Sequence, residues 1–417
     1  MVNKKFVIFV YAHWKGLEEP MLIGILSAHY AKGKKAFSFE YERNWMISGQ
    51  QSVLDPDIQF YSGPQYPNGK ENFGIFLDSM PDTWGRTLMK RRAAQEARLN
   101  NMTPRTLYEI DYLLGVYDES RMGGLRFKTD PEGPFLDDSA LEPTPPWTSV
   151  RELQQAAHIF ENEADGTEIG KWLAVLMAPG SSLGGARPKA NIKDEEDNLW
   201  IAKFPSKNDT INKGGWEFLA YRLGINCGIE MAPSRIERIT GKYHTFFTKR
   251  FDRDKRQRIH FSSAMTMTGN NEDTIRDQPA SYLDIAEFIQ THGVDVEKNL
   301  HQLWRRIVFN IAISNTDDHL RNHGFLLTPK GWVLSPAYDI NPSIDKAGLA
   351  LNIDMDNNAL DFDLAKSVGE YFRLDNTEMN QILIEVQNAV KDWKSIAKHI
   401  GIPNSEQILM SGAFRIN

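Results

Sequence analysis

Three side chains in the second half of this 417-residue sequence have the types and spacing that phosphoryl transfer requires. Asp317 and Asn322 follow an apolar run, and Asp339 follows a second, shorter apolar segment. Transfer of a phosphoryl group to a hydroxyl needs a base for the hydroxyl proton and oxygen ligands for magnesium, because charge develops on the transferred group. Asp317 fits the role of the base, and Asn322 and Asp339 fit the role of the metal ligands.

The spacing of Asp317 and Asn322 is that of the Asp and Asn in a protein-kinase catalytic loop. The apolar positions between residues 296 and 313 recur at helical spacing and predict a core helix before this loop. Residues 324–327 and 331–334 predict a strand hairpin after it. Such a hairpin would bring Asp317 and Asp339 to one of its ends.

A run of small residues at positions 181–186 could approach phosphates closely through its backbone amides. It lacks the Gly-Lys-Ser/Thr ending of a Walker loop, and a plain hairpin turn is the alternative interpretation. Lys203 favours the phosphate site, because kinases place a phosphate-binding lysine on a strand just after their Gly-rich loop. Glu217 is its expected partner, although a surface glutamate at a helix N-terminus would look the same.

Composition excludes several other classes of protein. A formal net charge of -7 argues against a protein that coats nucleic acid, so any phosphate binding should be local. Cys227 is the only cysteine, which excludes intramolecular disulfides and Cys-based zinc sites and suits a reducing cytoplasm. The apolar run that starts near Phe6 predicts a strand, and no run reaches the ~20 residues of a membrane span.

Changes in pattern along the chain predict three parts. Residues 1–146 are rich in strand patterns and end in a Pro-, Gly- and acid-rich segment. Residues 147–253 contain the small-residue run and the lysine strand, and residues 254–417 are mainly helical. Two amphipathic helices, with a short tail after them, are expected to close the chain. The first strands are expected at 6–11, 21–26 and 36–41.

Taken together in order and spacing, these motifs resemble those of the HipA-type serine/threonine kinases, the toxins of bacterial toxin–antitoxin pairs. The matching segments span much of residues 180–340. The β-rich first part resembles the N-terminal subdomain of this family more loosely. The matches are Ser182-Leu183-Gly184-Gly185-Ala186-Arg187-Pro188-Lys189, Lys203, Lys249-Arg250-Phe251-Asp252-Arg253, Asn315-Thr316-Asp317-Asp318-His319-Leu320-Arg321-Asn322 and Ala337-Tyr338-Asp339.

The resemblance implies an α+β, two-lobed protein-kinase-like fold with a β-rich N-terminal subdomain and a mainly helical C-terminal lobe. It implies ATP and Mg²⁺ as cofactors, Asp317 as the catalytic base, and Asn322 and Asp339 as magnesium ligands. It also implies autophosphorylation at Ser182, with the neighbouring Ser181 as the alternative. The implied ATP-binding residues are Ser182, Gly184, Gly185, Ala186, Lys203, Lys249, Phe251, His319, Asn322 and Tyr338.

The resemblance further implies a HipB-like helix-turn-helix antitoxin as partner, with DNA contacted only indirectly through it. The implied protein substrate is a translation component such as an aminoacyl-tRNA synthetase, and the implied location is the cytoplasm, with no membrane contact. Nothing in the sequence itself names the substrate.

Three other functions remain open from the residues alone. A metal hydrolase could use His319, His323 and a neighbouring aspartate, but it lacks the zincin glutamate and gives no role to Lys203. A small-molecule phosphotransferase would share the Asp–Asn–Asp pattern. A non-catalytic nucleotide-binding scaffold would keep the binding residues without turnover.

Overall fold

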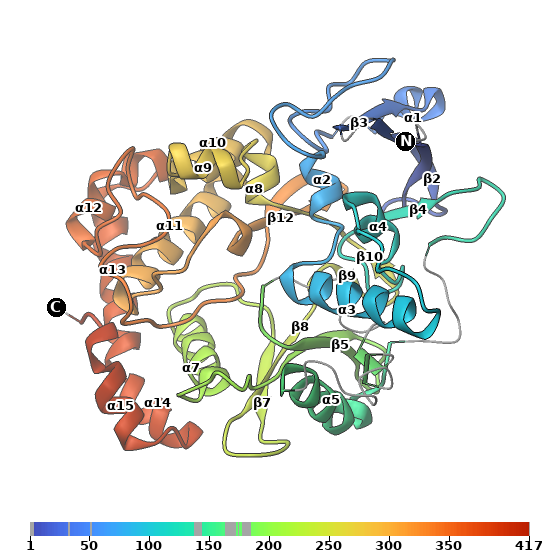
Figure 1. Cartoon of the computed structure of the whole chain (residues 1–417). Coiled ribbons are helices and arrows are strands. Elements are labelled where there is room, and N and C mark those ends of the chain that lie inside the picture. The colour runs from blue at the N-terminus through green and yellow to red at the C-terminus, as the bar shows by residue number, and fades with distance from the viewer. Residues whose placement is uncertain are drawn as a thin grey trace. The chain divides into compact units, whose positions relative to one another are not determined.

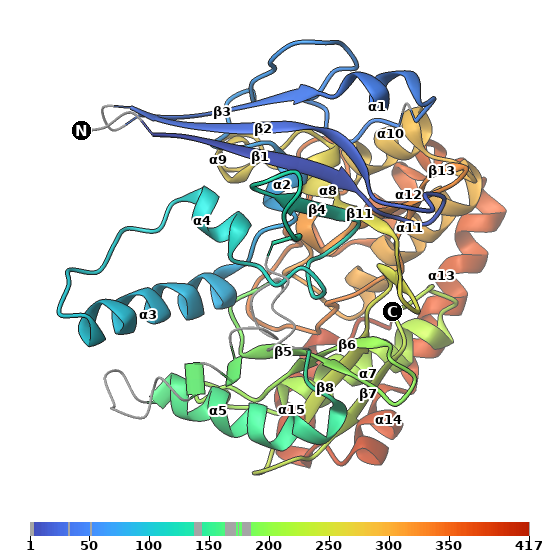
Figure 2. The same ribbon diagram turned by 90° about the vertical axis from the view of Figure 1, so that its right-hand side faces the viewer.

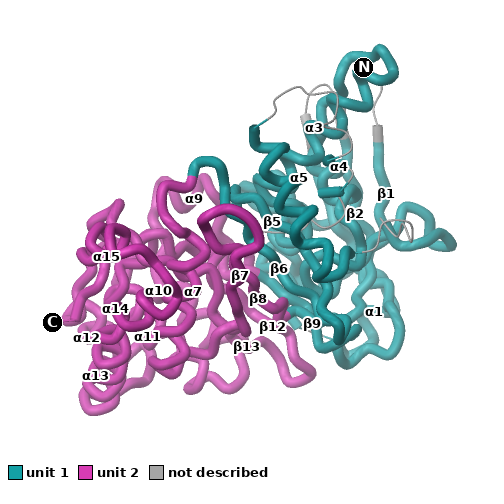
Figure 3. Tube along the Cα trace, turned by 90° about the horizontal axis from the view of Figure 1, so that it is seen from below, with its two compact units in different colours: residues 1–208, 252–262 teal, residues 209–251, 263–417 magenta. Residues whose placement is uncertain are grey.

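The computed structural model of the chain describes residues 4–31, 34–50, 52–136, 144–162, 172–173, 175–176 and 185–416. Figure 3 shows the two compact units into which the chain divides. The first unit comprises residues 1–208 and 252–262, and the second comprises residues 209–251 and 263–417. Both units combine helices and strands, as predicted for an α+β protein. The three-part division expected at residues 146 and 253 stays a prediction.

A four-stranded antiparallel sheet forms the N-terminal part of the first unit (Figure 1, Figure 2). Its strand order is β3-β2-β1-β4, and the register pairs Ile8 with Leu26 and Leu26 with Phe39. The alternation of apolar residues therefore places one set of side chains on a single face. The three strands predicted from the sequence are confirmed. The strands are β1 (Lys4–Ala12), β2 (Met21–Ala31), β3 (Lys34–Tyr41) and β4 (Leu125–Lys128).

Aromatic rings fill the interior beside this sheet. Phe39 lies 5.7 Å from Phe76, and Phe76 lies 6.1 Å from Phe127, measured between ring centroids. Phe73 packs edge-on against Phe76 at 5.9 Å. These contacts join strands to the short helix α2 and give the β-rich part its own core. The helices that follow in this unit are α1 (Arg43–Ile47), α2 (Gly74–Leu77), α3 (Thr83–Leu99), α4 (Glu109–Leu114), the 3₁₀ turn η1 (Trp147–Ser149) and α5 (Val150–Asn162).

Two further antiparallel hairpins belong to the first unit. The first pairs β5 (Lys189–Lys193) with β6 (Leu199–Lys203), so that Lys189 stands opposite Lys203. The second pairs β9 (Arg253–Asp254) with β10 (Gln257–Arg258). Strand β11 (His260–Ser263) follows and ends at the boundary of the unit. The strand predicted to carry Lys203 is confirmed as β6.

The second unit is mainly helical, as the sequence predicted for its C-terminal part (Figure 1). Its strands form two antiparallel hairpins, β7 (Ser234–Glu237) with β8 (Thr245–Lys249) and β12 (Gly324–Thr328) with β13 (Gly331–Leu334). The helices are α7 (Lys213–Asn226), α8 (Ala264–Met267), α9 (Glu272–Asp277), α10 (Tyr282–His292), α11 (Val296–Ala312), α12 (Phe362–Ser367), α13 (Asn376–Lys391), α14 (Trp393–Ile400) and α15 (Asn404–Met410). The 3₁₀ turns are η2 (Leu320–Asn322), η3 (Gly369–Phe372) and η4 (Ser411–Ala413).

Helix α11 is the centre of this unit's core. Its apolar side chains, among them Leu300, Trp304 and Ile307, are fully buried. Trp304 keeps its indole N–H satisfied by donating to the carbonyl of Ala365 at 2.9 Å. The neighbouring helices begin with capping boxes: Ser281 and Asp284 cap α10, and Asp375 and Glu378 cap α13. Local sequence therefore fixes where the helices around α11 begin.

The expectation that a short tail follows two closing helices is wrong. A further helix, α15, spans Asn404–Met410, and one of its side chains attaches it to another part of the unit. Glu406 accepts hydrogen bonds from the backbone N–H of Asn212 at 2.9 Å and from the indole of Trp216 at 3.1 Å. These contacts attach α15 to the start of α7. Among the described residues, no helix combines the length and apolarity that crossing a membrane requires.

Candidate active site

The loop that carries Asp317 begins with a defined stop of helix α11. Ser314 adopts a left-handed conformation with φ of 50°. Its N–H donates to the carbonyl of Ile311 at 3.2 Å, and the N–H of Asn315 donates to the carbonyl of Asn310 at 2.8 Å. This pair of bonds is a Schellman motif, which usually has glycine at the left-handed position. The helix thus ends at a fixed residue, and the chain leaves it in a fixed direction.

Asp317 presents its carboxylate to solvent, whereas the residues on either side of it, Thr316 and Asp318, are buried. The Asp317 side chain is 77% exposed, and Nζ of Lys346, whose side chain is 57% exposed, lies 3.6 Å from Oδ1. Asn322 is buried, and its amide nitrogen donates to the carbonyl of Asp317 at 3.1 Å. That bond uses the nitrogen and leaves the amide oxygen as the atom of Asn322 suited to a cation. The two predicted residues are therefore brought together by one hydrogen bond.

Asp318, the next residue, fixes this loop from inside. One oxygen, Oδ2, accepts from the hydroxyl of Tyr282 at 2.5 Å, from the amide of Asn310 at 2.8 Å and contacts Nε2 of His323 at 2.7 Å. Burial opposes the charge on this carboxylate, but His323 and the hydrogen bonds outweigh burial, so the pKa of Asp318 lies below its usual value. Asp318 is thus a buried anion that joins helices α10 and α11 to the loop.

Asp339 lies in a second loop that is tied to the first. Its φ of 56° is left-handed, a conformation that aspartate adopts more readily than most residues. Asn341 donates its amide to Asp339 Oδ1 at 3.5 Å, and its backbone N–H donates to Oδ1 of Asn315 at 3.2 Å. The N–H of Ser343 donates to the carbonyl of Ser314. The loops of Asp317 and Asp339 are therefore parts of one hydrogen-bonded structure.

The second unit also brings together predicted ATP-binding residues. The rings of Phe251 and Tyr338 lie 5.3 Å apart, and the Tyr338 hydroxyl donates to the carbonyl of Arg321 at 2.7 Å. Lys249 ends strand β8, where its N–H donates to the carbonyl of Pro233. His319 is half-buried between Asp318 and Leu320 in sequence, and its carbonyl accepts from the N–H of Asn322. The aromatic pair thus stands beside the loop that carries Asn322.

The remaining predicted residues divide between the two units. Gly185, Ala186 and Lys203 belong to the first unit, and Glu217 is buried in helix α7 of the second. The pairing of Lys203 with Glu217 stays a prediction. Three predicted residues of the small-residue run lie outside the described part of the chain, namely Ser181, Ser182 and Gly184.

Asn322 and Asp339 fit a magnesium site by their chemistry, because Mg²⁺ prefers carboxylate and amide oxygens and retains several waters. The histidines required by a hydrolase fit less well. His323 is buried with its Nε2 held by Asp318, which gives it a role inside the protein. Within the described ranges, no group of three or more His, Cys, Asp or Glu side chains is arranged to hold a metal ion.

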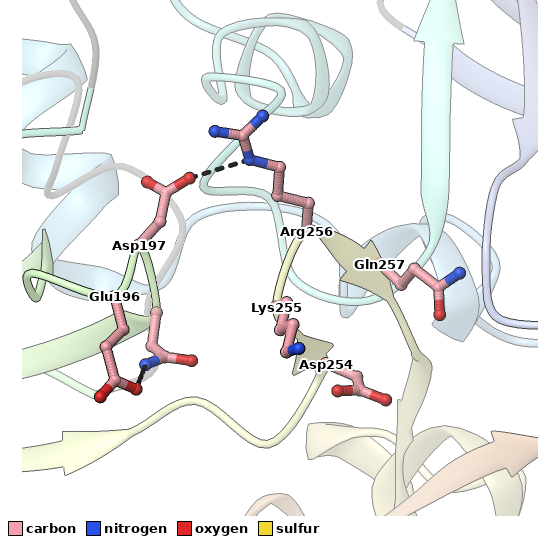
Figure 4. A pocket seen from close by; sticks show the side chains of 7 residues that line it. Glu196, Asp197, Asp254, Lys255, Arg256 and Gln257 are labelled. Atoms are coloured by element: carbon pink, nitrogen blue, oxygen red, sulfur yellow. Dashed lines mark hydrogen bonds and ion pairs between the residues drawn. The ribbon is translucent and has the colours of Figure 1, made fainter.

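A hollow of about 810 Å³ lies elsewhere, in the first unit, between the turns that follow β5 and β9 (Figure 4). Asp197 from one turn accepts from Nε of Arg256 in the other at 3.0 Å. The remaining lining residues are Glu196, Asn198, Asp254, Lys255 and Gln257. None of these is a predicted site residue. The candidate site lies in the two loops of the second unit that carry Asp317 and Asp339.

Sequence reasoning missed the residues that hold the site in place. Asp318 was considered as part of the catalytic-loop motif or as a hydrolase metal ligand, His323 only as such a ligand, and Asn341 not at all. Each of them forms a buried or bridging contact. The sequence contained one signal, the pair of adjacent acidic residues Asp317 and Asp318. Two such residues rarely have the same role when one of them faces an apolar helix. Tyr282 and Asn310 gave no such signal, since helical polar residues are usually solvated.

Comparisons with known proteins bear on the family and the fold of the chain. A family model described as "HipA-like C-terminal domain" matches residues 181–393, just over half of the chain. A relative from Haemophilus influenzae named "Putative kinase" is 29% identical over 182 residues, which are 38% of this chain and 52% of the relative. The chain thus spans about half the length of that curated relative.

Among solved structures, one chain from the Shewanella oneidensis MR-1 HipA, HipB and operator DNA complex matches with a TM-score of 0.65. The identity is 18%, and the match covers 97% of this chain and 94% of that chain. At this identity the likeness shows the fold, and it confirms the predicted kinase-like α+β architecture.

Proposed function

The chain belongs to the family with a HipA-like C-terminal domain, and from this premise we propose that it is an ATP- and Mg²⁺-dependent serine/threonine-protein kinase. The observation that carries the proposal is an exposed Asp317 carboxylate next to a buried Asn322, whose amide nitrogen donates to the backbone carbonyl of Asp317. A base must reach its substrate, whereas the group that positions a cation must not move. These two residues, five positions apart in one loop, meet the two requirements.

In the proposed reaction, the γ-phosphoryl group of ATP moves to a substrate hydroxyl. Asp317 accepts the hydroxyl proton, a new P–O bond forms to the substrate oxygen, and the bond to the ADP leaving oxygen breaks. Asn322 and Asp339 would hold Mg²⁺, which supplies neutralisation of the charge on the phosphate oxygens. The hydrogen bonds of Asp318 and Asn341 keep the two loops in place while the charge develops.

The proposed ATP contacts come from several further residues. Lys203 would bind the phosphates, with Glu217 as its partner, and the small residues around Gly185 and Ala186 would approach them through the backbone. The paired rings of Phe251 and Tyr338, with Lys249 and His319, would line the nucleotide site. Ser182, or the neighbouring Ser181, is the proposed autophosphorylation site, where an added dianion would repel ATP phosphates.

The proposed setting is a toxin–antitoxin pair in the cytoplasm. The Shewanella relative was solved with HipB and operator DNA, and for this chain we accordingly propose a HipB-like helix-turn-helix partner that would carry the DNA contacts. The proposed protein substrate is a translation component such as an aminoacyl-tRNA synthetase. A small-molecule phosphotransferase or a nucleotide-binding scaffold would share the loops but would not phosphorylate serine.

Mass spectrometry of the protein after incubation with ATP and Mg²⁺ tests the activity without knowledge of the substrate. Wild type should gain one phosphate on the peptide that contains Ser181 and Ser182, and Asp317→Asn should gain none. Loss of a positioned base costs about 10²–10⁴-fold in rate. Because the Asp317 side chain is exposed, the variant should unfold at the wild-type temperature.

The matched control is Asp363→Asn, which alters an aspartate that is 91% exposed on helix α12. It should behave as wild type in both measurements. Equal phosphorylation of wild type and Asp317→Asn would refute the assignment of the base, and no phosphate on either would favour the small-molecule or scaffold function.

A further inference from the structure

A buried ion pair in the first unit lies next to the described end of the small-residue run. Lys189 Nζ stands 3.4 Å from Oδ2 of Asp82, with side chains that are 5% and 12% exposed. Burial raises the pKa of Asp82 to about 6, although the ammonium of Lys189 opposes that rise. Asp82 is also the N-cap of helix α3, where its other oxygen accepts from the N–H of Gly85 at 2.9 Å. One carboxylate thus joins the start of α3 to strand β5.

Trp84 makes two more bonds from the same end of α3. Its indole N–H donates to the carbonyl of Lys189 at 3.0 Å, and its backbone N–H donates to the carbonyl of Gly185 at 3.3 Å. The indole is buried and packs edge-on against Phe160 of α5, with ring centroids 5.3 Å apart. The first turn of α3 therefore contacts both Gly185 and the strand that follows it.

The backbone at Gly185 favours glycine, because its φ of 86° is left-handed. A Cβ at this position would lie 2.9 Å from Nζ of Lys189, so the end of that side chain would have to shift. Lys189 also stands opposite Lys203 in the β5–β6 register, so both lysine side chains leave the same face of the hairpin. Like charges at opposite positions repel, and the Asp82 carboxylate offsets one of them. The ion pair with Asp82 thus holds Lys189 Nζ beside Gly185 and offsets one of the two positive charges on this face of the hairpin.

We propose that Asp82, Trp84 and Lys189 are positioning residues that hold the Gly185 backbone and the Lys203 side of the hairpin in the geometry that binds ATP phosphates. This inference rests on the proposed function, because it assumes that Gly185 and Lys203 contact ATP. It extends that function to helix α3, which no predicted site residue belongs to. The β-rich N-terminal part therefore contributes to nucleotide binding through three contacts at the first turn of α3.

The test is the dissociation constant of Mg²⁺-ATP, measured by titration calorimetry on the full chain. Trp84→Phe keeps the ring against Phe160 but removes the bond to the Lys189 carbonyl, and it should raise the dissociation constant about fivefold. Lys189→Met leaves Asp82 buried without its cation and should raise the constant about tenfold or more. Glu96→Gln is the control on the same helix, in an exposed pair with Arg92, and should have no effect.

A double variant separates positioning from general destabilisation. If Trp84 and Lys189 act on the same backbone, the combined increase should be smaller than the product of the two single increases. A purely structural role would lower the unfolding temperature of both variants and leave the dissociation constant within twofold of wild type. That result would overturn the inference.

Asp317→Asn, measured in parallel, keeps the two proposals distinct. It should bind Mg²⁺-ATP as wild type does and fail to turn it over. Normal turnover by Asp317→Asn would refute the proposed mechanism and leave the binding series as a valid test of α3. If wild type does not bind Mg²⁺-ATP, both proposals fail together.

Discussion

Asp318 and His323 meet inside the second unit, with Oδ2 and Nε2 2.7 Å apart and both side chains almost fully buried. The chain between them contains Asn322, and Asp317 precedes them directly. The contact therefore closes the loop that carries the proposed base and one proposed metal ligand. A site held by buried hydrogen bonds does not need to reorganise as charge develops, which is how preorganised sites lower a barrier.

Replacing Asp318 should damage stability and activity together. Asp318→Ala leaves the donors of Tyr282, Asn310 and His323 without their acceptor. Loss of hydrogen bonds to a buried charged group should lower the free energy of unfolding by about 3 kcal/mol. Turnover of ATP, assayed well below the unfolding temperature, should fall at least tenfold because the loop loses its anchor.

Urea unfolding at pH 7 and a steady-state assay would measure the two effects. Asp363→Ala, at an exposed aspartate of α12, should change the free energy of unfolding by less than about 0.5 kcal/mol. An Asp318→Ala protein with wild-type stability would show that the buried contacts have little energetic value. Wild-type turnover in a destabilised variant would show that the loop does not need them.

Asp339 should control the magnesium requirement. Asp339→Asn removes the charge of a proposed ligand but retains a residue that tolerates a φ of 56°. The concentration of Mg²⁺ that gives half-maximal turnover should rise tenfold or more, while the unfolding temperature stays close to that of wild type. A magnesium titration at saturating ATP measures this shift.

Asp345→Asn is the matched control, because Asp345 lies in the same loop and its carboxylate accepts a hydrogen bond from the hydroxyl of neighbouring Ser343 at 3.4 Å. Its magnesium curve should overlay that of wild type. If Asp339→Asn gives the same curve, the metal must be held by other groups, and the assignment made from the sequence is wrong.

The elements with strong periodicity could be predicted from the sequence. The first three strands, β6 and α11 lie where alternation or helical spacing placed them, because in these elements the buried face dictates the pattern. Helix α15 was missed because its stability comes from Glu406, whose partners at residues 212 and 216 lie far away in the chain. No local pattern carries such a contact.

The chemistry of the candidate site could be predicted from the sequence, but the contacts that hold its residues in place could not. Asp317, Asn322 and Asp339 were proposed as site residues because three oxygen side chains at fixed spacing suggest one reaction. Ser314 was not expected at the end of α11, since a left-handed helix stop is normally glycine. That position is held by a distant residue, Arg415, whose Nε donates to the Ser314 hydroxyl at 3.3 Å. Contacts of this kind become visible only in three dimensions.

Stability of the first unit at low pH should depend on His260. Burial lowers the pKa of this imidazole, which stacks on Trp14 at 4.8 Å, to about 3. The unfolded chain takes up a proton near pH 6.5 and the folded chain does not, so the contribution of His260 is present above pH 6.5 and is lost as the pH falls toward 3. Between pH 7 and pH 5 the loss should be about 2 kcal/mol, because one proton is worth ~1.36 kcal/mol per pH unit.

His260→Phe keeps an aromatic ring beside Trp14 and removes this titration. Urea unfolding of both proteins at the two pH values tests this expectation. From pH 7 to pH 5, the free energy of unfolding should fall by about 2 kcal/mol more for wild type than for His260→Phe. His29→Gln, at an exposed position on β2, should follow wild type at both pH values. A difference between His260→Phe and wild type that does not change with pH would mean that His260 becomes protonated in the folded protein.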